Sequence, residues 1–400
     1  NVFVLPKPAD TIRVICLGAS TMQGYPHPRN NTLPAYLQDM LNECVTEGRR
    51  VEVLNFGYVA VASFPVACMA RELAGAEPDL VVVYAGQNEF FGAYGVLSSQ
   101  FGGRSVAAMR FRRAVRSFRI AKLIARAIEA VRWGDDSKTD RSLIEVMAAR
   151  ELKRSDSRTV DRAAANLETN LKTVAKECRS MGVPVVFCTL VVNESEVAPI
   201  ASAEPTSLET ADRAAWRSEM AAAESLLTTK PVEALAHLER ARGLFPDSAM
   251  VHYRTGRAQQ AAGDDAEALE AYRQAIDLDL LPWRAPSAVR DAVRRAADNQ
   301  AILAEVETAF RTEAGGAPLG WAWVIDHVHP TARGHALAAR TVADALVADA
   351  RIDWIDREEL NGLPPVEHGV ERHDNGPLGE FALAFQMTSL FRRKGFADNN

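Results

Sequence analysis

Residues 80–84 read Leu80-Val81-Val82-Val83-Tyr84, a stretch in which no side chain is charged. A strand with one face in water alternates apolar and polar residues, whereas a strand covered by helices on both faces is apolar throughout. Two mainly apolar runs precede it, at Ile12 to Leu17 and at Val51 to Leu54, and helical patterns separate the three runs, at Leu33 to Val45 and at Val66 to Leu73. This order predicts a βαβαβ unit whose strands form one parallel sheet.

The same alternation returns in the second half of the chain. A helical pattern from about Ala163 to Met181 leads into an apolar run at Val183 to Leu190. Further along, Ala301 to Phe310 is predicted as a last strand and Thr331 to Val347 as the helix that follows it. We therefore expect an α/β fold class, with a three-layer α/β/α domain built on a parallel sheet.

An insert interrupts this alternation between about Pro199 and Pro286, where the composition becomes rich in alanine and glutamate. Glu233-Ala234-Leu235 recurs as Glu267-Ala268-Leu269, 34 residues later, which is the tetratricopeptide period. In that register small residues match small ones and large residues match large ones, as in the pairs Ala234 and Ala268, Ala241 and Ala275, and Leu238 and Tyr272. Gly256 lies where the first helix of a repeat needs a close approach.

We therefore expect an all-α, tetratricopeptide-like insert. Since at most two repeats are visible and a free-standing array needs about three, the insert should lean on the main domain. The predicted division is then residues 1–198 as the first part of the α/β domain, 199–286 as the insert, 287–350 as the last part of the α/β domain, and 351–400 as a C-terminal extension.

Two other segments carry helical patterns. Residues 104–132 are basic and amphipathic, which is typical of a solvated helix face, although a lid or a patch that faces anionic lipid is the alternative. A short amphipathic piece lies around Phe381 to Phe391 in the tail.

The composition excludes several classes of protein. With 48% hydrophobic and 24% charged residues, the 400-residue chain is neither disordered nor fibrous, and its net charge of -6 gives no reason to expect nucleic acid. Cys16 and Cys188 lie in apolar runs, so they are predicted to be core residues rather than partners in disulfides. No stretch reaches the roughly 18 apolar residues of a membrane span. The chain opens with Asn1 rather than Met, which leaves room for an upstream anchor or signal.

A serine stands at the end of the first predicted strand, in Ile15-Cys16-Leu17-Gly18-Ala19-Ser20-Thr21-Met22-Gln23-Gly24. The carboxyl edge of an open parallel sheet is where ligands bind. Gly18 and Gly24 permit a tight turn there, and a helix start offers N–H groups to a developing oxyanion. Alone, a Gly-x-Ser sequence is more often a helix-capping serine than a nucleophile.

Three further motifs are predicted at the same edge of the sheet. Asn55-Phe56-Gly57 ends the second strand and continues to Ala60, and Gly86-Gln87-Asn88-Glu89 follows the third strand. The third motif, Asp326-His327-Val328-His329-Pro330, precedes the last helix. The ordered set, from about Ile12 to Val347, resembles the motifs of the SGNH (GDSL-like) hydrolase superfamily, which implies a flavodoxin-like α/β/α domain.

A narrower resemblance rests on the phrases Asn88-Glu89-Phe90, Arg284-Ala285-Pro286 and His327-Val328-His329-Pro330, with the repeat insert among them. Together they are similar to a bacterial group of SGNH proteins that carry tetratricopeptide repeats. Members of that group often start with a membrane anchor, which favours an extracytoplasmic or membrane-anchored location in a bacterium. The unpaired cysteines leave the cytoplasm open.

The resemblance implies roles for individual residues. Ser20 would be the nucleophile, His329 its general base and Asp326 the carboxylate that orients the imidazole. The chemistry asks for the same residue types, because a serine hydroxyl attacks an ester only when a base takes its proton. Asp326 and His329, three residues apart, are expected on one side of a helical turn, and an N-cap before Pro330 is the alternative for Asp326.

Other polar residues are predicted around this trio. The oxyanion hole would comprise the N–H groups of Ser20 and Ala60 and the side-chain amide of Asn88. Many SGNH proteins have Gly in place of Ala60 and Asp in place of Ala19. Asn193 and Arg284 are further candidates for substrate binding, and a loop cap is the alternative for Asn193. His327 is expected at the surface or behind the catalytic residues.

No cofactor or metal is expected. The eight histidines include no pair at a metal-binding helical spacing with an acidic partner, and no phosphate-binding glycine motif follows the first strand. The predicted function is hydrolysis of an O-acyl ester through an acyl-serine intermediate. The alternatives are O-acyl transfer to a saccharide or other alcohol, and a protein-interaction module with a vestigial SGNH domain. Expected partners are an acylated small molecule, a saccharide or a carrier-bound substrate, and a protein bound by the insert.

Overall fold

A five-stranded parallel sheet lies at the centre of the computed structural model, which describes residues 3–98, 105–110, 155–373 and 376. The strands are β1 (Thr11–Gly18), β2 (Arg50–Gly57), β3 (Leu80–Tyr84), β4 (Val185–Cys188) and β5 (Ile302–Ala304). Their order is β2-β1-β3-β4-β5, the flavodoxin-like order of doubly wound sheets. The predicted α/β fold class is confirmed.

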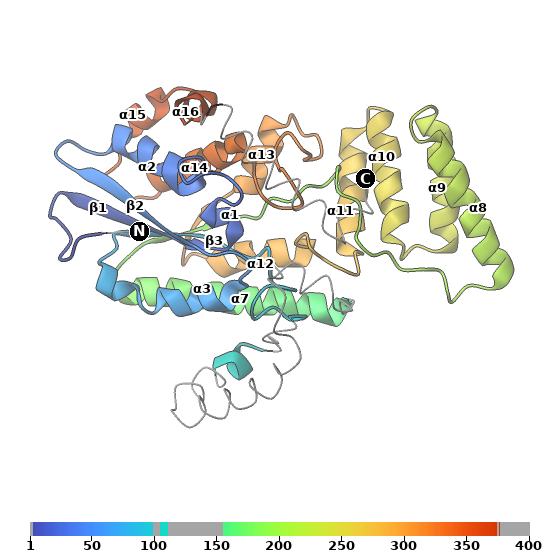
Figure 1. The fold of residues 1–400 in the computed structure, drawn as a ribbon, viewed down its shortest axis with the longest axis horizontal. Helices are drawn as coiled ribbons and strands as arrows, with labels where there is room; N and C mark the ends of the chain where they lie inside the picture. The colour runs from blue at the N-terminus through green and yellow to red at the C-terminus, as the bar shows by residue number, and fades with distance from the viewer. Residues whose placement is uncertain (1–2, 99–104, 111–154, 374–375, 377–400) are drawn as a thin grey trace, which may run out of the picture.

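Helices cover both faces of the sheet, which makes three layers (Figure 1). One face carries α2 (Leu33–Cys44), α13 (Val306–Glu313) and α14 (Ala332–Val347). The other carries α3 (Ser63–Ala70), α7 (Ser157–Ser180) and α12 (Ser287–Ala297). Two short helices, α1 (Ser20–Gln23) and η1 (Leu73–Ala76), lie in the connections. Because both faces are covered, every residue of β1 and β3 is buried.

The core contains Cys16 and Cys188, as the sequence predicted. Both thiols are free and fully or nearly fully buried. Burial raises the pKa of each thiol far above its ordinary value, so both remain protonated and unreactive.

The predicted strand from Ala301 to Phe310 is wrong beyond its first residues. The strand β5 ends at Ala304, and α13 begins at Val306. Val306 and Phe310 are both fully buried, and their spacing of four residues places them on one face of a helix. The apolar run therefore contains two short elements with different periods.

Residues between β4 and α12 form a row of four helices beside the sheet (Figure 1). They are α8 (Thr210–Leu226), α9 (Pro231–Leu244), α10 (Ala249–Ala261) and α11 (Asp265–Asp277). Their matched positions are almost completely buried, namely Ala234, Leu238, Ala241, Ala268, Tyr272 and Ala275. A Cβ on Gly256 would lie 2.8 Å from the Tyr272 ring, so the close approach of α10 and α11 requires glycine. The tetratricopeptide assignment and the boundaries of this unit stay predictions.

Both ends of the helical row are tied to each other and to the loop after β4. The N–H of Leu280 donates to the carbonyl of Ala201, and the Asp279 carboxylate accepts the N–H groups of Ile200 and Ala201. The hydroxyl of Tyr253 donates to the carbonyl of Ser195 at 2.9 Å. The row therefore leans on the α/β part of the chain.

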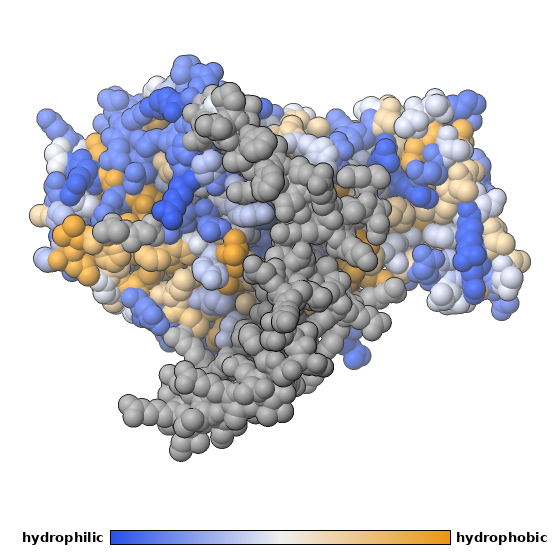
Figure 2. All heavy atoms as spheres, in the orientation of Figure 1, coloured by the Kyte–Doolittle hydropathy of each residue, from blue (hydrophilic) through white to orange (hydrophobic). Residues whose placement is uncertain are grey.

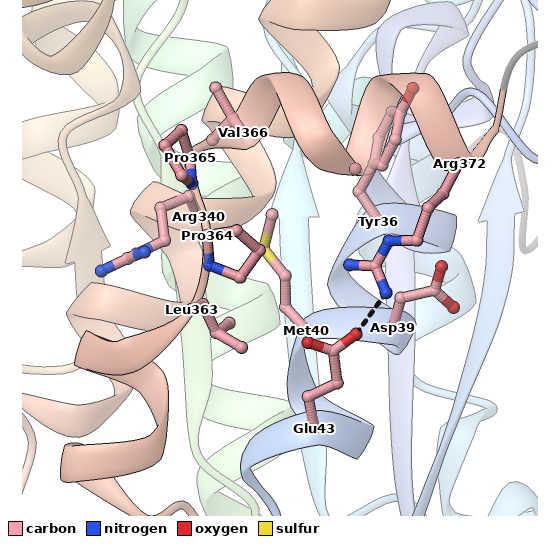
Figure 3. A pocket seen from close by; sticks show the side chains of 11 residues that line it. Tyr36, Asp39, Met40, Glu43, Arg340, Leu363, Pro364, Pro365, Val366 and Arg372 are labelled. Carbon is pink, nitrogen blue, oxygen red and sulfur yellow. Dashed lines mark hydrogen bonds and ion pairs between the residues drawn. The ribbon is translucent and has the colours of Figure 1, made fainter.

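The C-terminal helices α15 (Arg357–Gly362) and α16 (Val366–Arg372) lie near α2 and α14 (Figure 1). Figure 3 shows the small pocket between them, across which Arg372 of α16 donates to Glu43 of α2 at 2.6 Å. None of the candidate site residues lines this pocket. Beyond residues 105–110, the basic segment 104–132 lies outside the described residues, as does the piece around Phe381 to Phe391.

Within the described residues, every helix is too short or too polar to cross a bilayer. Figure 2 shows apolar surface at the end of the sheet where the strands begin. Val4 and Leu5, which precede β1, are 64% and 52% exposed. That end is opposite the edge that carries Ser20.

Candidate active site

Ser20 lies at the junction of β1, an interior strand of the sheet, and a one-turn helix. The strand β1 ends at Gly18, and α1 begins at Ser20 and ends with Gly24 in the left-handed region at φ 91°. A Cβ on Gly18 would lie 2.3 Å from the carbonyl oxygen of Tyr84, so only glycine lets the chain turn so close to β3. Ser20 itself is 8% exposed, which leaves its hydroxyl at the edge of the interior.

Three side chains form a continuous hydrogen-bonded chain at this junction. The hydroxyl of Ser20 lies 2.7 Å from Nε2 of His329, and Nδ1 of the same ring lies 2.5 Å from Oδ2 of Asp326. A carboxylate can only accept, so Nδ1 carries the ring proton and Nε2 is left to accept the proton of the hydroxyl. The structure therefore brings together Ser20, Asp326 and His329. Asp326 and His329 are 3 residues apart in the sequence, and Ser20 and His329 are 309 residues apart.

Asp326 and His329 lie on a bend, which corrects the expected helical turn. Oδ1 of Asp326 accepts the N–H groups of Val328 and His329, both at 2.8 Å, and this curls the segment back on itself. The following helix α14 is capped by Thr331, whose hydroxyl accepts the N–H of Gly334, so Asp326 is not the N-cap. The Asp326 carboxylate is thus held by three donors.

Electrostatics keep Asp326 ionised. Complete burial alone would raise the pKa of its carboxyl, but His329, His327 and the hydrogen bonds outweigh burial and hold the pKa well below its usual range. An ionised Asp326 fixes the ring orientation of His329.

The environment of His329 contains aromatic residues that the sequence did not single out. The ring of Tyr25 lies edge-on to His329 with centroids 5.2 Å apart, and Nε2 of His27 lies 3.0 Å from the carbonyl of Pro330. His335 is fully buried beside His27, and burial holds its pKa well below the usual value. Tyr25 and His27 stand directly after the Ser20 motif, which is the only signal that could have indicated them.

His327 is not at the surface, so that part of its predicted placement is wrong. It is 9% exposed, lies against the ring of Trp283 at a centroid distance of 5.6 Å, and approaches Asp326. Burial lowers the pKa of His327 to about 4, so the ring is neutral at neutral pH. Nδ1 of His327 lies 3.6 Å from Oδ1 of Asp326.

Asn88 and Ala60 both lie next to Gly92. A Cβ on Gly92 would lie 2.7 Å from Cβ of Asn88 and 3.2 Å from the carbonyl oxygen of Ala60, so both residues border the same small space. Ala60 has a left-handed backbone at φ 56°. The buried Nδ2 of Asn88 has no hydrogen-bond partner among the described residues. An unsatisfied buried donor is costly, by about 1–3 kcal/mol, unless a ligand uses it.

Asn193 and Arg284 bond to the backbone of the loop after β4, so Asn193 has the contact of a loop cap, the alternative to its expected role in substrate binding. Asn193 is fully buried, and its Oδ1 accepts the N–H of Glu196. Arg284 is 2% exposed and donates to the carbonyls of Asn193 and Val197. Both residues brace the loop after β4. The N–H of Asn193 also donates to the carbonyl of His327, so this loop supports the Asp326 bend.

No family model matches the sequence, and no curated protein matches it. Several solved structures are similar to it at low identity. One is an acetylxylan esterase from Geobacillus stearothermophilus, 11% identical with a TM-score of 0.38, the match covering 84% of this chain and 93% of the esterase. A second is the acetyl xylan esterase AlAXEase, 11% identical with a TM-score of 0.36, covering 84% and 99%.

A third similar structure is a lipolytic protein of the G-D-S-L family from Desulfitobacterium hafniense, 10% identical with a TM-score of 0.33, covering 83% of this chain and 98% of that protein. These likenesses are distant. The contacts of Ser20, His329 and Asp326 indicate what the site can do chemically.

Proposed function

We propose that the chain is a serine-dependent ester hydrolase that cleaves an O-acyl ester through an acyl-serine intermediate. The observation that carries the proposal is the hydrogen-bonded chain from Ser20 through His329 to Asp326, at 2.7 Å and 2.5 Å. A nucleophile within reach of a base, whose far nitrogen is held by a carboxylate, is the arrangement that activates a serine hydroxyl.

The proposed reaction has two halves. In the first, Oγ of Ser20 attacks the ester carbonyl carbon while its proton moves to Nε2 of His329. The tetrahedral intermediate then expels the alcohol, which takes that proton, and leaves the acyl group on Ser20. In the second, water attacks the acyl-serine, its proton moves to His329 and then to Oγ, and the carboxylic acid departs.

Charge on the attacked oxygen would be met by the N–H groups of Ser20 and Ala60 and by Nδ2 of Asn88. Nδ2 of Asn88 has no partner among the described residues and lies beside Ala60, which supports this assignment. Donors that are already in position need no reorganisation when the charge develops, which is why such groups stabilise the transition state strongly.

We further propose that the helical row of residues 199–286 contributes to the choice of substrate or carrier protein. Its entry loop is the one that Asn193 and Arg284 brace against the Asp326 bend, so the row is attached close to the reacting groups. A row of paired helices offers a concave face on which extended chains can bind.

A fluorophosphonate probe tests the mechanism directly, because it reacts only with an activated serine. We expect the intact chain to be labelled on Ser20, as located by peptide mass spectrometry. Ser20→Ala should lose the label and retain its circular dichroism spectrum. Labelling of another residue, or equal labelling of Ser20→Ala, would show that the proposed nucleophile is wrong.

A further inference from the structure

Glu89 is a buried carboxylate next to Asn88 that the proposed reaction does not use. Its side chain is 3% exposed, and the described residues give it no ion pair with a cation. A buried carboxyl without a cationic partner is costly to ionise, so the hydrogen bonds that it makes indicate its role.

Within the described residues, the side-chain hydrogen bonds of Glu89 all go to Ser63. One carboxylate oxygen accepts the N–H of Ser63 at 2.7 Å, and the other accepts its hydroxyl at 3.0 Å. The Ser63 hydroxyl in turn accepts from Nδ2 of Asn170 on α7 at 2.9 Å. Ser63 is the first residue of α3, whose N-cap Ala62 has no side chain that could cap the helix. Glu89 therefore binds the start of α3 in place of an N-cap residue.

The segment that Glu89 holds is the one that carries Ala60. Residues 60–62 pair with the turn after β3, because the N–H of Ala93 donates to the carbonyl of Ala60 at 2.8 Å and the N–H of Ala62 donates to the carbonyl of Ala93 at 3.1 Å. Ala60 has a left-handed backbone, which is unfavourable for a residue with a Cβ and persists only when its surroundings impose it. Glu89 and these two backbone bonds impose it.

We propose that Glu89 is a positioning residue that fixes the N–H of Ala60 relative to the amide of Asn88, so that both donors meet the same oxyanion. The inference rests on the proposed function, since it assigns a purpose to the geometry of the oxyanion donors. Glu89 follows Asn88 directly, so the residue that supplies one donor is covalently joined to the residue that holds the other.

The first experiment compares two substitutions at Glu89 by steady-state kinetics on p-nitrophenyl acetate. Glu89→Ala removes both contacts to Ser63, so kcat should fall about tenfold or more while KM stays within about twofold, as expected when a transition-state donor is misplaced. Glu89→Gln keeps an acceptor for the N–H of Ser63 and should recover most of kcat. Glu47→Ala removes an exposed carboxylate and serves as the matched control.

A double-mutant cycle separates positioning from a general loss of fold. If Glu89 acts through the oxyanion donors, Glu89→Ala should lower kcat much less in the Asn88→Ala background than in the intact chain. Additive effects, an unchanged kcat in Glu89→Ala, or a rise in KM alone would overturn the inference. Should Glu89→Ala fail to fold, Ser63→Ala takes its place in the same cycle; it removes the hydroxyl and its bonds with Glu89 and Asn170 but keeps the N–H that Glu89 accepts.

Hydrogen exchange distinguishes failure of this inference from failure of the proposed function. Absence of ester turnover and of Ser20 labelling in the intact chain would refute the function. The exchange of backbone amides in residues 60–63 can still be measured, and Glu89→Gln should protect them more than Glu89→Ala does. Equal protection in the two variants would overturn the positioning role whatever the activity of the chain.

Discussion

The imidazole of His329 accepts a hydrogen bond from the hydroxyl of Ser20 across 2.7 Å, although 309 positions separate the two residues in the chain. The contact exists because β1 lies in the interior of the sheet and the bend that carries His329 folds back over the carboxyl edge of the strands. Its strength depends on which ring nitrogen carries the proton, and that is decided by Asp326.

Asp326→Asn should lower kcat/KM by about 10⁴-fold. The asparagine side chain can donate its amide proton to Nδ1, which would place the ring proton on Nε2, where it can no longer accept from Ser20. Steady-state kinetics on p-nitrophenyl acetate would measure the loss, with His329→Ala as the comparison expected to be at least as severe. A loss of less than tenfold in a folded variant would mean that Asp326 does not control the base.

Asn88→Ala should lower kcat by about 10²–10³-fold and leave KM nearly unchanged. The reason is that the unpartnered Nδ2 would meet an oxyanion that exists only during the reaction. A rise in KM with an unchanged kcat would instead assign Asn88 to binding of the substrate in its ground state.

The sheet and the meeting of the polar motifs were predictable because both follow from local pattern. Leu80 to Tyr84 matches β3 residue for residue, since a strand buried on both faces shows an unbroken apolar run. Ser20, Asn88 and Asp326 were expected at one edge because parallel strands end on the same side. No local sequence pattern predicts which side chains at that edge form hydrogen bonds with each other.

The errors have the same origin. Asn193 and Arg284 were expected to bind substrate, but Oδ1 of Asn193 accepts a backbone N–H and Arg284 donates to backbone carbonyls, and the sequence does not show the direction of a side chain. The contact between Glu89 and Ser63 joins the turn after β3 to the start of α3, and such hydrogen bonds give no periodic pattern in the sequence. The strand predicted through Phe310 failed because a three-residue strand is too short to show its period.

An exposed substitution in the helical row should spare the chemistry. Val232 of α9 is 70% exposed, so Val232→Glu changes the surface without disturbing packing. We expect kcat/KM for p-nitrophenyl acetate to stay within about twofold of the intact chain, because a small ester reaches Ser20 without the row. A loss comparable to that of Ser20→Ala, in a variant with an unchanged circular dichroism spectrum, would make the row part of the reacting site.

Glu89→Gln should change the pH dependence of stability in a defined direction. Burial raises the pKa of Glu89 to about 7, from an ordinary value of 4.5, although the hydrogen bonds from Ser63 oppose the rise. Between these two values the folded chain binds more protons at Glu89 than the unfolded chain does. The contribution of Glu89 to stability is therefore fully present below about pH 4.5 and is lost as the pH rises through about 7.

Glutamine does not ionise, so Glu89→Gln removes this loss. Relative to the intact chain, the free energy of unfolding of the variant should rise by about 3 kcal/mol between pH 4.5 and pH 8, since one pKa unit corresponds to about 1.4 kcal/mol. The added amide N–H₂ shifts the variant by a constant amount at every pH and leaves the slope unaffected. Urea unfolding at four pH values would measure the difference. A difference that is flat with pH would show that the Glu89 carboxyl has an ordinary pKa in the folded chain.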